Sequence, residues 1–122
     1  MTGQQVWEQA LALLNYTDGE GRPGVQGGSA LRGRALYLVN QMLRELWNTE
    51  QSTAFAPLAH LGEAVWLSER AAEALPYGVA MLLAQGEGDN DNYAVFRTLY
   101  TQKRAALSVM TARQDVFPRV EG

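Results

Sequence analysis

The sequence predicts an all-α protein, a small bundle of about four helices that forms a single domain over residues 1–122. Four stretches carry apolar residues at the three- and four-residue spacing of a helix face. Capping residues, glycines and prolines separate these stretches. The chain is 47% hydrophobic and 19% charged, which suits one globular core. We also expect a long Gly-rich loop after the first helix and an irregular or extended segment before the third.

The charge balance argues against a tight nucleic-acid binder. The net charge is −3, whereas such proteins are usually basic, so at most weak non-specific DNA contact is expected. Cysteine is absent, which excludes disulfides and thiolate metal sites. No signal peptide and no apolar run of membrane-spanning length is visible, so we expect a soluble protein made in the cytoplasm, with no membrane partner.

The first helix is predicted over Gln4–Leu14, where apolar residues follow one stripe. Asn15–Gly28 then holds five glycines and a proline, and is predicted to be a flexible loop. Gly19, Gly21 and Gly24 match the spacing of a dinucleotide fingerprint. No strand precedes them and no helix opens after them, so no cofactor is expected.

The second helix is predicted from Ser29, a suitable N-cap, to about Thr49. Trp47, near its end, is expected to be buried because tryptophan is highly buried on average. Glu50–Leu67 loses helical periodicity and contains proline and glycine. The apolar side chains of this segment are expected to cover one side of the bundle; they are Phe55, Leu58, Leu61, Val65 and Trp66.

The third helix is predicted to follow Ser68 as N-cap and to end near Gly86 and Gly88, which can take the positive φ of a helix end. Pro76 lies inside it, so a kink is expected. Asp89, Asn90 or Asp91 can cap the next helix, with acidic charge at the favourable end of the helix dipole.

The fourth helix is predicted over about Asn90–Arg113. Its buried stripe is formed by Tyr93, Phe96, Tyr100 and Leu107. Arg97 and Arg104 lie together beside that stripe, either as a solvated flank or as a partner-contacting edge.

Pro118 should prevent helix formation beyond this point, so Asp115–Gly122 is predicted to be a C-terminal tail. Val116 and Phe117 are apolar for a tail, which makes them candidate partner contacts.

No residue pattern indicates catalysis or a resident metal. His60 is the only histidine, and no metal-ligand spacing surrounds it. The run that begins at Asp89 resembles the start of a calcium loop but lacks the required glycine and glutamate, so it is interpreted as a helix cap. We therefore expect a non-enzyme without cofactors.

Leu67–Tyr100 carries a motif with the order Leu-Pro-Tyr-Gly, a polar turn, and spaced aromatic residues. Its residues are Leu75, Pro76, Tyr77, Gly78, Asp89, Tyr93, Phe96 and Tyr100. This motif, which spans roughly the second half of the chain, resembles head–tail connector (head-completion adaptor) proteins of tailed bacteriophages and prophages.

The resemblance implies a small helical virion protein that forms a ring under the portal at the head–tail junction. Such a protein joins the portal protein to tail-completion proteins and helps retain packaged DNA. Whether it is a monomer in isolation is left open.

Two alternatives remain. One is a helical DNA-binding regulator encoded in a prophage, although the turn expected over Gln85–Asp91 is too long for a helix-turn-helix motif. The other is a small ligand-binding bundle with a pocket beneath the Asn15–Gly28 loop.

Overall fold

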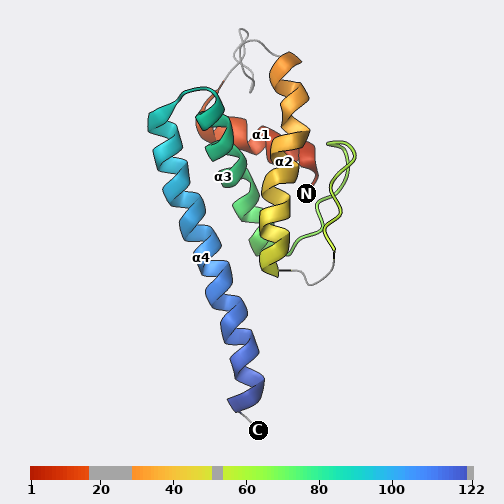
Figure 1. The fold of residues 1–122 in the computed structure, drawn as a ribbon, viewed down its shortest axis with the longest axis vertical. Coiled ribbons are helices and arrows are strands. Elements are labelled where there is room, and N and C mark those ends of the chain that lie inside the picture. The colour runs from red at the N-terminus through yellow and green to blue at the C-terminus, as the bar shows by residue number, and fades with distance from the viewer. Residues whose placement is uncertain (17–28, 51–53, 121–122) are drawn as a thin grey trace.

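The computed structural model describes residues 1–16, 29–50 and 54–120, with side chains described within 1–16, 34–47 and 54–107. These residues form four helices and no β-strand, which confirms the predicted all-α bundle. α3 and α4 run antiparallel as a hairpin, α1 crosses near the end where they connect, and α2 packs beside α3 (Figure 1). The helices are α1 (Gly3–Leu14), α2 (Ser29–Glu50), α3 (Glu69–Gly86) and α4 (Asn90–Val120).

The start of α1 is fixed by hydrogen bonds that satisfy its first backbone N–H groups. A helix leaves four such groups without internal partners. The N–H groups of Gly3 and Gln4 donate to the carbonyls of Glu63 and Leu61, at 3.1 and 2.8 Å. Thr2 is the N-cap. Its hydroxyl accepts a hydrogen bond from the N–H of Gln5, and its own N–H donates to the Gln5 side chain, which together form a capping box. Helix α1 therefore begins on the irregular segment that precedes α3.

The described part of the segment before α3, residues 54–68, forms no β-strand. A single antiparallel bridge pairs its residue Ala64 with Thr2. Leu58 and Val65 are buried as predicted, and Trp47 is half-buried with its ring edge-on to Phe55. Trp66 contradicts the prediction that it covers the bundle, because it is 76% exposed. Successive side chains of an extended chain point in opposite directions, so the inward Val65 leaves Trp66 outward.

The core is built from one face of each helix. Its fully buried members include Val6 of α1, Leu43 and Leu46 of α2, and Leu75 and Leu83 of α3. Phe96 and Tyr100 of α4 are also buried, while Tyr93 and Leu107 pack against the core from its edge. The predicted apolar stripe of the fourth helix is thus confirmed for its described side chains.

Helix α4 is longer than predicted. It continues to Val120, so the predicted end near Arg113 and the non-helical tail over Asp115–Gly122 are wrong as far as Val120. Pro118 is the third residue from the end of the helix. Pro118 lacks the N–H that would donate to the carbonyl four residues earlier, so the helix continues across it with one backbone hydrogen bond fewer. Helix α3 likewise continues across Pro76.

Several predictions fall on residues outside the described parts of the structure. Most of the predicted Asn15–Gly28 loop lies there, as do the side chains of Ser29, Val116 and Phe117. Of that loop, Asn15 is described and adopts a left-handed conformation with φ 58°, which ends α1.

Candidate functional site

The motif residues of α3 and α4 meet along the interior of the α3–α4 hairpin. Leu75 is fully buried, and Phe96 and Tyr100 face α3 from α4. A β-carbon added to Gly78 would overlap Met42 Sδ and lie 3.0 Å from Tyr100 Cε1. A larger residue would require the Met42 side chain to move, so glycine allows Met42 of α2 and Tyr100 of α4 to lie close to α3 at this position.

The turn between α3 and α4 is only three residues long, Glu87 to Asp89. Gly88 has φ 72°, as predicted for a glycine that ends the helix. The N–H groups of Asp89 and Gly88 donate to the carbonyls of Ala84 and Gln85, at 2.9 and 3.2 Å. These are the two bonds of a Schellman helix end.

Asp89 caps α4, which settles the three alternatives left open by the sequence. Its Oδ1 accepts from the backbone N–H of Asn92 at 3.3 Å. Its Oδ2 accepts from Tyr16 Oη and from Asn92 Nδ2, both at 2.7 Å. Hydrogen bonds from Tyr16 and then Asn92 hold the pKa of Asp89 below its ordinary value. Tyr16 follows α1, so this carboxylate ties the end of α1 to the hairpin turn.

Two buried or half-buried tyrosines have raised pKa values. Burial is the main cause of the raised pKa of Tyr16, and the hydrogen bond to Asp89 adds to it. Burial also raises the pKa of Tyr100, followed by the negative charge of Glu45. Both phenols are therefore neutral under ordinary conditions and serve as packing groups with a polar end.

The short α3–α4 turn corrects one argument against a DNA-binding regulator. The connection was expected to be too long for a helix-turn-helix motif, but three residues is within its usual range. The geometry is nevertheless different, because α3 and α4 lie side by side as an antiparallel hairpin (Figure 1). The two helices of a helix-turn-helix motif instead cross at roughly 90–120°.

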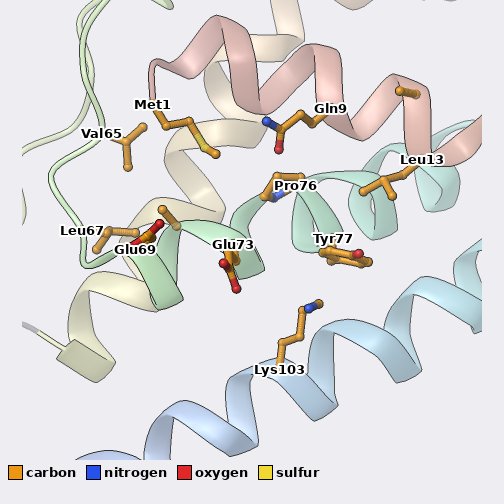
Figure 2. Close-up of a pocket in the computed structure, with 12 residues that line it drawn as sticks. Met1, Gln9, Leu13, Val65, Leu67, Glu69, Glu73, Pro76, Tyr77 and Lys103 are labelled. Carbon is orange, nitrogen blue, oxygen red and sulfur yellow. The ribbon is translucent and has the colours of Figure 1, made fainter.

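An open groove of about 900 Å³ lies between α1, the first half of α3 and α4, and we call it the hairpin groove (Figure 2). Pro76 and Tyr77, two motif residues, form part of its floor. Leu13 of α1 and Met1 bring apolar surface to it, 38% and 43% exposed. The remaining lining residues are Gln9, Ala12, Val65, Leu67, Glu69, Ala72, Glu73 and Lys103.

The charged residues of the groove belong to two helices. Glu69 and Glu73 are exposed and lie one turn apart on α3. Lys103 of α4 places its Nζ 4.6 Å from the centre of the Tyr77 ring, a cation–π contact (Figure 2). The groove therefore combines an apolar floor with two carboxylates and one ammonium group.

Among the described residues, no Asp, Glu, Lys, Arg, His, Asn, Gln, Ser or Thr is buried, although the hydroxyl of Tyr100 is, and no group of three or more His, Cys, Asp or Glu residues could hold a metal ion. His60 lies exposed in the segment before α3, and its Nε2 is 3.5 Å from Glu63 Oε1. The Ser68 hydroxyl accepts a hydrogen bond from the N–H of Ala71, which confirms its predicted cap.

The predicted contact residues do not form one cluster. Arg104 pairs with Glu45 of α2, and both Arg104 and Arg97, about two turns earlier on α4, are exposed. Val116 and Phe117 lie in the last turns of α4, with side chains outside the described set. Sequence reasoning missed the groove residues Leu13 and Lys103. Leu13 gave one signal, because it is an apolar residue off the buried stripe of α1.

No helix among the described residues is long and apolar enough to cross a bilayer. In comparisons with protein-family models, curated proteins and solved structures, no match to this chain was found.

Proposed function

We propose that this protein is a structural adaptor of a tailed bacteriophage or prophage, located in the virion at the head–tail junction. It joins the portal ring to tail-completion proteins and helps retain packaged DNA. The observation that carries the proposal is the position of the resembling motif. Its residues build the α3–α4 hairpin, and two of them, Pro76 and Tyr77, continue onto an open groove.

The shape of the chain supports an assembly role. A ring subunit needs two different surfaces, because head-to-tail contacts close into a ring. The hairpin groove is one such surface. The last turns of α4, which project beyond the other helices, supply another (Figure 1).

The chemistry of the groove favours a macromolecular partner over a small ligand. Small-ligand pockets usually enclose most of the ligand and place a few polar groups deep inside. Here the carboxylates Glu69 and Glu73 are exposed, and the groove is open to solvent. An extended apolar and charged surface suits a protein segment.

Deletion of the gene in an inducible prophage, with complementation from a plasmid, tests the proposal. We expect induced cells without the gene to contain heads that lack attached tails, as seen by electron microscopy. Complementation should restore tailed particles. Normal tailed, infectious particles without the gene would contradict the proposal. Tight, salt-dependent DNA binding by the purified protein would instead favour the regulator.

A further inference from the structure

The distal part of α4 extends away from the body of the molecule. α4 has 31 residues and its antiparallel partner α3 has 18, so the excess corresponds to about 20 Å of helix. Figure 1 shows these turns continuing past the start of α3 with no other helix beside them. We call residues 113–120 the distal segment.

The sequence of the distal segment complements the hairpin groove. It contains Val116, Phe117 and Val120 as apolar residues, two arginines, and one aspartate. The groove offers an apolar floor with two glutamates and one lysine. Each charge type in the segment therefore has its opposite in the groove, in equal numbers.

We propose that the distal segment of one copy docks in the hairpin groove of a second copy. The groove of the same chain is out of reach, because Lys103 lines it and α4 continues from there away from the body (Figure 1). Exposed apolar side chains such as Met1 and Leu13 become covered in the contact.

This contact is head-to-tail, because groove and segment are unlike surfaces. Repetition of such a contact yields a closed ring or an open filament, not a symmetric dimer. The inference deepens the proposed function and rests on it for the expectation that the contact closes into a ring. It can nevertheless be tested without any portal protein.

Two single variants separate the surfaces. Leu13→Arg places a cation in the groove, and Phe117→Asp places an anion in the distal segment. Val95→Arg is the matched control, because Val95 is 52% exposed on α4 and does not line the groove. Thermal unfolding of each variant checks that the bundle remains intact.

Native mass spectrometry and sedimentation velocity of the full chain, over a range of concentrations, give the result. We expect the wild type and Val95→Arg to form oligomers larger than dimers. Each groove or segment variant alone should associate at least about tenfold more weakly. An equimolar mixture of Leu13→Arg and Phe117→Asp should form a dimer containing one of each, because one intact groove and one intact segment remain.

A second measurement addresses the charges. Reversal of Glu69 and Glu73 to arginine, or of Arg113 and Arg119 to glutamate, should weaken association, and combining all four changes in one chain should restore it.

A monomeric wild type, unchanged association of both variants, or no heterodimer in the mixture would overturn the proposal. A monomer that binds purified portal rings through the groove would also overturn it, and would identify the portal protein as the occupant while leaving the adaptor function intact. Self-association that depends on the groove and the distal segment, together with normal tailed particles after gene deletion, would support the docking contact and contradict the adaptor function.

Discussion

The α3–α4 hairpin and the start of α1 are held in different ways. The hairpin is held by the buried side chains of Leu75, Phe96 and Tyr100, and Tyr100 lies against Gly78. The start of α1 is held by backbone hydrogen bonds to the segment before α3, at 2.8–3.1 Å. Side-chain packing leaves a periodic pattern in the sequence, whereas backbone bonds can be made by almost any residue. The comparison predicts that the hairpin sets global stability and that the α1 junction opens more locally.

The largest expected effect comes from Leu75→Ala, which removes a fully buried side chain from the centre of the hairpin. Such a change should lower the free energy of unfolding by about 2–5 kcal/mol. Urea unfolding followed by circular dichroism measures this loss. Leu13→Ala is the control, because Leu13 is partly exposed in the groove, and it should change stability much less. Equal effects of the two variants would contradict the assignment of the core.

Gly78→Ala should lower stability by about 1–3 kcal/mol through overpacking. The added methyl group would overlap Met42 Sδ and approach Met42 Cγ to 2.9 Å. Gly86→Ala provides the control, since the nearest atom to its β-carbon, on Arg34, would be at 3.4 Å. It should be neutral or slightly stabilising.

A coupling between Gly78→Ala and Met42→Ala in a double-mutant cycle would locate the strain. Additive effects would place it elsewhere.

Asn40 of α2 holds the segment that accepts the backbone hydrogen bonds of α1, so it tests the second region of the comparison. Its side chain accepts from Leu58 N–H at 2.8 Å and donates to the Leu58 carbonyl at 3.0 Å. Asn40→Ala should therefore lower stability by about 1–3 kcal/mol. Amide hydrogen exchange should accelerate most at Leu58 and its neighbours. If the amides of α3 accelerated to the same extent, the junction would not be a separate local unit.

The smallest expected effect is that of Tyr16→Phe, which removes the hydrogen bond to Asp89. The pKa of Asp89 should rise toward its ordinary value. A lowered pKa means that Asp89 stabilises the fold above its unfolded pKa, and that this contribution is lost as pH falls through the folded pKa. The variant should therefore show a smaller loss of stability on acidification. A carboxyl NMR titration that left the Asp89 pKa unchanged would contradict this role.

The start of α3 and the turn from α3 into α4 were the most predictable features. Ser68, Gly88 and Asp89 act through their own side chain or their own φ angle, so each leaves a local signal. The apolar stripes of α1, α2 and α4 were predictable because the apolar residues recur at helical spacing within each helix.

Other features depend on distant parts of the chain. The groove arises where α1, α3 and α4 diverge, which no single stretch encodes. The pairing of Arg104 with Glu45 joins residues 59 positions apart. The continuation of α4 past Pro118 was missed because proline was treated as an absolute stop, although α3 also continues across Pro76.

We propose that outer surfaces of this helical body, and no enclosed pocket, contact the portal. The most direct measurement is native mass spectrometry of purified portal rings mixed with the full chain. The account predicts a defined increase in mass that corresponds to a complete ring of copies on each portal. Intact portal rings whose mass stays unchanged at saturating protein would contradict it.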